Sequence, residues 1–66
     1  MEPKHPEITV ELTGQDGNAF FILGAVRKAL QREGVAQAEI DLFMQEAKSG
    51  DYDHLLQTCM RWVSVE

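Results

Sequence analysis

A short polar segment, Thr13-Gly14-Gln15-Asp16-Gly17-Asn18, constrains the fold more than any other part of this sequence. Before it, residues 8–12 alternate between apolar and polar side chains, which is the period-two pattern of a strand with one buried face. After it begins a long stretch with helical spacing. Its two glycines give the backbone freedom to turn, and Asp16 and Asn18 can accept hydrogen bonds from the free N–H groups at a helix start. The segment therefore predicts a strand-to-helix turn.

Three helices and a second strand are predicted after this turn. Residues 18–33 place their apolar side chains on one side of a helical wheel, and Gly34 stands where a helix commonly ends in a left-handed residue. Residues 37–48 show the same periodicity. Asp51 is placed as the N-cap of a third helix, and the aromatic and β-branched residues 62–65 suit a short strand.

The predicted order β-α-α-α-β gives an α+β fold, in which two short strands pack against three helices. If each element reverses the chain direction, the two strands run parallel. Residues 1–6 contain both prolines and no periodicity, so we expect a flexible N-terminal tail there and a single domain over residues 7–66. A chain of 66 residues is close to the lower limit at which one core can hold a fold without a disulfide or metal.

Composition limits the function classes. The single cysteine, Cys59, excludes a disulfide within the chain, and no apolar run approaches the roughly 18 residues of a membrane span. We therefore expect a cytoplasmic protein with no membrane association. The net charge of −5 is spread along the sequence and opposes general attraction to nucleic acid or anionic lipid.

Two further segments accompany the turn at 13–18: Ser-Gly-Asp-Tyr-Asp-His-Leu-Leu at 49–56 and Cys-Met-Arg-Trp-Val at 59–63. With these segments, the chain resembles short bacterial and phage- or plasmid-borne proteins that are usually described only as hypothetical. The resemblance covers about residues 8–65. It implies no activity, cofactor or catalytic residue, and points to a small accessory factor rather than a housekeeping enzyme.

The turn Asp16-Gly17-Asn18 is a candidate ligand site, because N–H groups at a helix start attract anions. The segment matches neither the dinucleotide-binding glycine pattern nor the phosphate-binding loop with its lysine, and Asp16 would repel an anion. Helix capping is therefore the favoured interpretation. The alternative is a small ligand- or phosphate-binding protein that uses this turn together with His54, which requires the first and third helices to start on the same side of the domain.

Asp51, Asp53, His54 and Cys59 are the residue types of metal sites and thiol catalysis. Cys59 and His54, however, are five residues apart, which separates them by about 140° around a helix. We interpret these four side chains as structural, and predict no catalytic residue, metal or cofactor.

Arg27, Lys28 and Arg32 form the main basic concentration of the sequence. Glu33 lies in the same turn, and three charges give only a small electrostatic contribution to phosphate binding. A solvated helix face is the favoured interpretation, and nucleic-acid binding through these residues is the alternative.

Several apolar residues lie off the predicted core faces. The first helix cannot turn both Phe20 and Phe21 to its apolar stripe, and Leu42 lies off the stripe of the second helix. Local packing is favoured for Phe21 and Leu42, with a protein interface as the alternative. Trp62, at the junction of helix and strand, is favoured as a core residue, with a partner anchor as the alternative.

The sequence thus favours a small non-enzymatic accessory or adaptor protein that acts by protein-protein interaction. Its partner is an unknown protein or a second copy of the chain, contacted through Phe21, Leu42 and the exposed edge of the small sheet.

Overall fold

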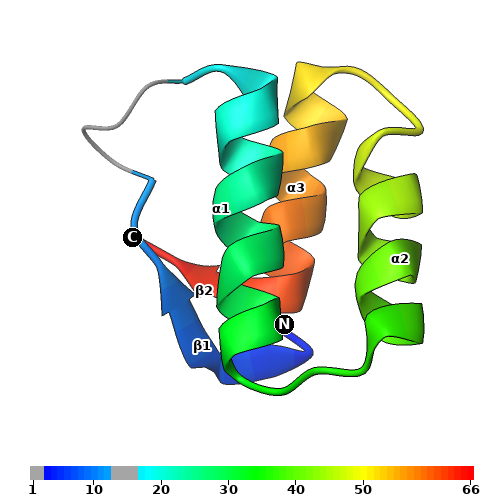
Figure 1. The fold of residues 1–66 in the computed structure, drawn as a ribbon. Coiled ribbons are helices and arrows are strands. Elements are labelled where there is room, and N and C mark those ends of the chain that lie inside the picture. The colour runs from blue at the N-terminus through cyan, green and yellow to red at the C-terminus, as the bar shows by residue number, and fades with distance from the viewer. Residues whose placement is uncertain (1–2, 13–16) are drawn as a thin grey trace.

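The computed structural model of the chain describes residues 3–12 and 17–66, and it confirms the α+β fold and the order β-α-α-α-β. Figure 1 shows the two strands on one side, with α1 and α3 beside them and α2 farthest from the sheet. The elements are β1 (His5–Val10), α1 (Ala19–Arg32), α2 (Gln37–Ala47), α3 (Tyr52–Trp62) and β2 (Val63–Val65).

The helix ends follow from the capping residues read in the sequence. The Asn18 side chain accepts a hydrogen bond from the Phe20 amide at 2.8 Å, and Asp51 accepts one from the His54 amide at 2.9 Å. Gly34 has a φ of 81°, a conformation that side-chain-bearing residues rarely adopt, and this reverses the chain after α1. These three positions explain why both ends of α1 and the start of α3 agree with the sequence to within a residue or two.

The two strands are parallel, with an irregular register. His5 is opposite Val63 and Thr9 is opposite Ser64, so β1 carries extra residues between these two pairs. The irregularity includes Pro6, which has no amide hydrogen to give to a ladder. The Ser64 hydroxyl donates to the Pro6 carbonyl at 2.9 Å, which ties β2 to β1 within this irregular stretch.

Residues 4–6 are part of the fold, which differs from the flexible tail expected over residues 1–6; residues 1–2 lie outside the described residues. The Lys4 Nζ atom lies 4.3 Å from the centroid of the Trp62 ring. His5 begins β1, its ring stacks on Trp62 with centroids 6.1 Å apart, and its Nε2 lies 3.2 Å from Oε1 of Glu39. The strand therefore starts three residues before the first residue of the apolar alternation.

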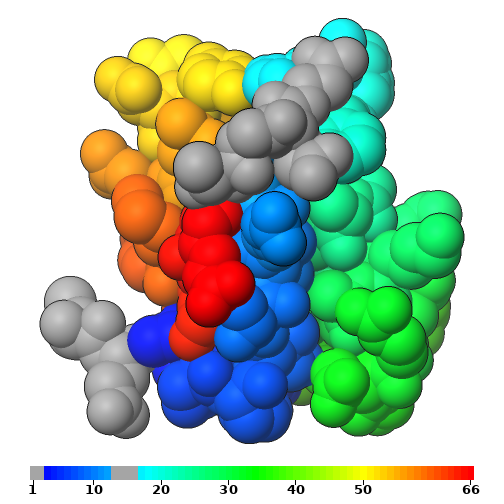
Figure 2. All heavy atoms as spheres, turned by 90° about the vertical axis from the view of Figure 1, so that its left-hand side faces the viewer, coloured from blue at the N-terminus to red at the C-terminus, as the bar shows by residue number. Residues whose placement is uncertain are grey.

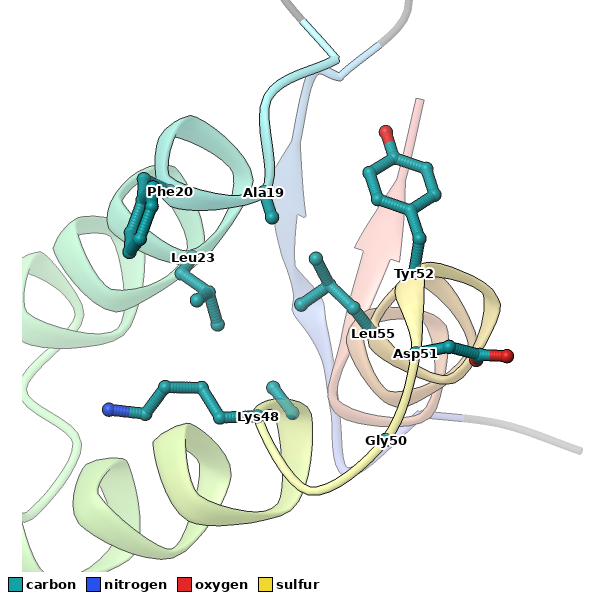
Figure 3. A pocket seen from close by; sticks show the side chains of 9 residues that line it. Ala19, Phe20, Leu23, Lys48, Gly50, Asp51, Tyr52 and Leu55 are labelled. Carbon is teal, nitrogen blue, oxygen red and sulfur yellow. The ribbon is translucent and has the colours of Figure 1, made fainter.

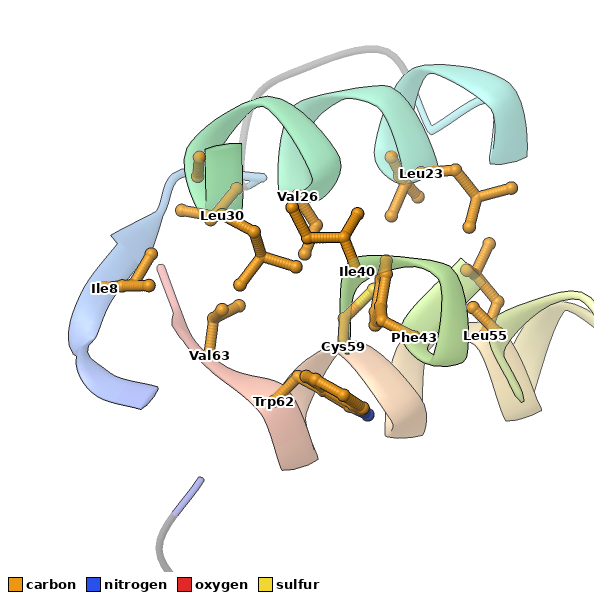
Figure 4. Packing of buried hydrophobic residues seen from close by; sticks show 14 residues of the cluster. Ile8, Leu23, Val26, Leu30, Ile40, Phe43, Leu55, Cys59, Trp62 and Val63 are labelled. Carbon is orange, nitrogen blue, oxygen red and sulfur yellow. The ribbon is translucent and has the colours of Figure 1, made fainter. Parts of the chain in front are cut away.

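One core joins all five elements, and Figure 4 shows its side chains meeting between α1, α2, α3 and the strands. Phe43 from α2 is fully buried at its centre and meets the Trp62 ring edge-on, with centroids 5.6 Å apart. The buried apolar residues are Ile8, Val10, Ile22, Leu23, Val26, Ala29, Leu30, Ile40, Phe43, Ala47, Leu55, Cys59, Trp62 and Val63. None of the helices among the described residues is long and apolar enough to cross a membrane.

Candidate functional site

The starts of α1 and α3 lie together, as a site built from the turn and the third helix requires. The Tyr52 hydroxyl donates to the Gly17 carbonyl at 2.6 Å, and an added side chain at Gly17 would meet that hydroxyl. Asn18 caps α1. Asp16, the third residue of the predicted ligand turn, lies outside the described residues. The described part of the turn is thus joined to α3 through its backbone.

His54 faces the end of α2. Its Nε2 lies 2.8 Å from the Glu46 carbonyl oxygen and 3.1 Å from the Ser49 hydroxyl. A carbonyl oxygen only accepts hydrogen bonds, so Nε2 carries a hydrogen and donates. The imidazole thereby satisfies a carbonyl at the C-terminal end of α2, where backbone acceptors lack helical partners. No hydrogen bond joins it to the described residues of the turn.

Gly50 leaves room for the His54 side chain beside the connection between α2 and α3. A Cβ atom at position 50 would come within 2.8 Å of the Cβ and Cγ atoms of His54, closer than real Cβ atoms approach. The connection between α2 and α3 therefore packs tightly on the imidazole ring, and this brings the end of α2 next to the start of α3.

The other candidate reactive side chains are separated. Asp51 caps α3, Asp53 is exposed in its first turn, and Cys59 is fully buried in the core. Burial raises the pKa of the Cys59 thiol to about 11, partly offset by a backbone hydrogen bond, so the thiol is neutral at physiological pH. Among the described residues, no group of three or more His, Cys, Asp or Glu side chains is arranged to hold a metal ion.

An apolar groove of about 320 Å³ opens at the helix starts. Figure 3 shows Phe20 and Leu23 of α1 on one side, Leu55 and Tyr52 of α3 on the other, and the Lys48 side chain extending from the end of α2 toward α1. The groove is lined by Ala19, Phe20, Leu23, Ala47, Lys48, Gly50, Asp51, Tyr52 and Leu55. We call this surface the helix-start groove.

Phe20 is the more exposed of the two aromatic residues that line this groove, Phe20 and Tyr52. Its side chain is 83% exposed, while Leu23, Ala47 and Leu55 of the groove belong to the buried core. A large apolar side chain therefore stands in solvent beside an opening that leads to the core. The sequence indicated Phe21 rather than Phe20 as the interface residue. The helical spacing of apolar residues does not show that the end of α2 lies beside the first turn of α1.

The three predicted interface residues have different positions. Phe21 is 41% exposed on α1 and Leu42 is 57% exposed on α2, whereas Trp62 is 3% exposed in the core. Trp62 thus has the core position that was its favoured interpretation. Leu42 lies opposite the buried residues of α2, and neither it nor Phe21 lines the helix-start groove.

The basic residues of α1 divide between two flanks. Lys28 and Arg32 line a second cleft, of about 220 Å³, together with Thr9, Val10, Glu11, Ala25 and Ala29. Arg27 is exposed and does not line this cleft. The predicted basic cluster is therefore not a single surface.

Comparison with known proteins gives no relative for this chain: no family model, no curated protein and no solved structure matches it. The resemblance to short bacterial and phage-borne proteins stays a prediction.

Proposed function

We propose that this chain is a small non-enzymatic protein-binding module, and that the helix-start groove receives an apolar side chain of its partner. The observation that carries the proposal is Phe20, 83% exposed at the rim of an apolar opening to the core. Single exposed apolar residues are common, but an exposed aromatic beside a concave apolar surface is the usual composition of an interface centre.

The groove matches one large side chain in size and chemistry. Its volume is about 320 Å³, and its walls include Leu23 and Leu55. An aromatic side chain buries about 150–250 Å² when it is enclosed, so filling the groove would be strongly favourable. Lys48 is the basic side chain along the opening, and a carboxylate next to the inserted residue would complement it.

A second copy of the chain meets these requirements. A twofold interface uses the same surface on both partners, so the projecting group and its receptor must lie on one face. Phe20 projects beside the groove on the same face. In such a dimer each Phe20 would enter the groove of the other copy.

The non-enzymatic role is supported by how the candidate reactive side chains are used. His54 donates to a helix-end carbonyl, Asp51 caps a helix, and Cys59 is a buried neutral thiol. Each has a structural partner or environment that accounts for its residue type.

Sedimentation equilibrium of the wild-type protein and of Phe20→Ala tests the dimer. Because two Phe20 side chains are lost per dimer, at about 1.5–3 kcal/mol each, we expect the dissociation constant to rise by about 10²- to 10⁴-fold. Met60→Ala is the matched control, because Met60 is 53% exposed on α3 and does not line the groove. A wild-type monomer up to millimolar concentration, or equal effects of the two substitutions, would exclude the dimer.

If the wild-type protein is a monomer, a photo-crosslinking amino acid at position 20 tests for a different partner in the organism that encodes the chain. We expect one dominant adduct from position 20 and none of the same mass from position 60. Adducts that are diffuse or identical at the two positions would refute binding through the groove.

A further inference from the structure

The outer edge of β1 carries backbone groups that pair with no described residue. The Glu66 amide donates to the Val10 carbonyl at 3.0 Å, and the Leu12 amide donates to the Glu66 carbonyl at 2.7 Å, so Val10 and Leu12 direct their groups toward β2. Successive residues of a strand direct these groups to opposite sides. Thr9, and Glu11 in the extension of β1 that Leu12 pairs to Glu66, therefore present their N–H and C=O groups at the other edge. The sheet has only two strands among the described residues.

This edge faces the flank of α1 across a cleft. Figure 2 shows β1 in blue between β2 in red and α1 in cyan to green. The cleft of about 220 Å³ lies along this boundary, with Thr9 and Glu11 on the strand side and Lys28 and Arg32 on the helix side. We call it the β1 cleft. A strand added to β1 would lie along this flank of α1.

The flank of α1 carries a stripe of side chains that changes from apolar to basic along the helix. Phe21, Ala25, Lys28 and Arg32 follow the spacing i, i+4, i+7, i+11, which places them on one helix face. Since the last three line the β1 cleft, the exposed Phe21 lies at the N-terminal end of the same face. An added strand would thus meet an apolar contact at one end of the stripe and two cations at the other.

The charge of the β1 cleft differs from that of the whole protein. Within residues 3–12 and 17–66, no acidic side chain lies within 4.0 Å of Lys28 or Arg32, whereas Arg61 pairs with Glu46 at 3.8 Å. The chain as a whole carries a net charge of −5. Two unpaired cations beside an open strand edge favour an incoming strand that carries carboxylates.

A second copy of β1 is a poor occupant. In an antiparallel pair centred on Thr9, Glu7 of one copy would stand opposite Glu11 of the other, and like charges directly opposite each other destabilise a strand pair. A nucleic-acid backbone is also disfavoured, because it has no N–H groups to donate to the carbonyl groups of a strand edge, whereas an extended peptide offers both donors and acceptors.

We propose that the free edge of β1 binds an extended segment of a partner protein as a third strand, with carboxylate side chains turned toward Lys28 and Arg32. Main-chain hydrogen bonds to Thr9 and Glu11 would hold the segment, and the two cations would select its acidic face. This surface is separate from the helix-start groove, so each of the two proposals can fail without the other.

The probe is a capped seven-residue peptide in which Thr alternates with Glu, added to the full chain labelled with ¹⁵N. We expect binding with a dissociation constant of about 1 mM or tighter, with shifts and slowed hydrogen exchange at the Thr9 and Glu11 amides. The same peptide with Lys in place of Glu should bind at least tenfold more weakly. N-methylation of the peptide amides that face β1 should abolish binding.

Substitutions distinguish peptide binding at the β1 cleft from general attraction of the acidic peptide to basic side chains. The pair Lys28→Gln and Arg32→Gln should weaken peptide binding at least tenfold, whereas Arg27→Gln, which removes a cation from the other flank of α1, should change it less than twofold. Phe20→Ala should leave peptide binding unchanged, so a failure of the groove proposal is recognised separately.

Three results would overturn the proposal. The first is the absence of shifts at Thr9 and Glu11 at peptide concentrations of several millimolar. The second is binding that survives N-methylation, which would show charge attraction without strand addition. The third is tighter binding of single-stranded DNA of equal charge than of the acidic peptide, which would favour a nucleic-acid surface.

Discussion

Replacing His5 with alanine removes two contacts that hold β1 against the helices. The Nε2 atom lies 3.2 Å from the Glu39 carboxylate, and the ring stacks on Trp62 at an interplanar angle of 29°. A hydrogen bond of this kind contributes about 0.5–1.5 kcal/mol, and a ring contact contributes a similar amount. Because the side chain is half-buried, we expect the free energy of unfolding to fall by about 1–2 kcal/mol.

This loss is a large fraction of the expected total. A domain of 66 residues has a free energy of unfolding of about 3–10 kcal/mol. Urea denaturation followed by the fluorescence of Trp62, the single tryptophan of the chain, measures the change at the contact itself. With a urea slope of about 1 kcal/mol/M, the midpoint should fall by about 1–2 M.

His5→Phe separates the two contacts, because it keeps a ring over Trp62 and loses the bond to Glu39. We expect it to lose about half as much stability as His5→Ala. If His5→Ala changed the free energy of unfolding by less than about 0.3 kcal/mol, and the Trp62 emission stayed the same, our assignment of His5 to the fold would be wrong. The first six residues would then behave as the tail that the sequence predicts.

Three further predictions concern the core, one helix end and pH. Phe43→Ala should lower the free energy of unfolding by about 3–5 kcal/mol and leave little folded protein in far-UV circular dichroism at 37 °C; a cooperative transition near the wild-type midpoint would contradict the central place of Phe43. Gly34→Ala forces a side chain into a φ of 81° and should lower the free energy of unfolding by about 1 kcal/mol in urea titration, while Gly24→Ala, in open space on α1, should not lower it. The thiol of Cys59 keeps its proton to about pH 11 in the folded state but only to about 9 when unfolded, so its contribution to stability is intact below pH 9 and is lost as pH rises to 11. Relative to Cys59→Ala, the wild-type protein should lose about 2–3 kcal/mol between pH 8 and pH 11, and equal slopes in the two proteins would refute this.

Local signals predicted most of the fold. Asn18, Asp51 and Gly34 are short-range signals, since a cap or a left-handed residue acts within one helical turn. The N-terminal strand start was not predictable in this way. His5 and Pro6 break the apolar alternation, and the contacts that order them come from Glu39 and Trp62, far along the chain.

The candidate surfaces likewise divide into features that short-range patterns predict and features that depend on contacts between separate elements. That Phe20 or Phe21 would be exposed follows from helical periodicity, but the groove beside Phe20 depends on the end of α2 and the start of α3 packing together beside the first turn of α1. That packing rests on the bond from His54 to the Glu46 carbonyl, across the connection between the two helices. Such a contact between the end of one helix and the start of the next leaves no periodic pattern in a sequence.

The parallel pairing of β1 with β2 also sets an order of events during synthesis. The Ser64 hydroxyl and the Pro6 carbonyl that it binds are 58 residues apart, so the sheet cannot close until nearly all of this sequence has left the ribosome. The helices between them are local structures that can form earlier. Substitutions in β1 are therefore expected to accelerate unfolding more than they slow folding.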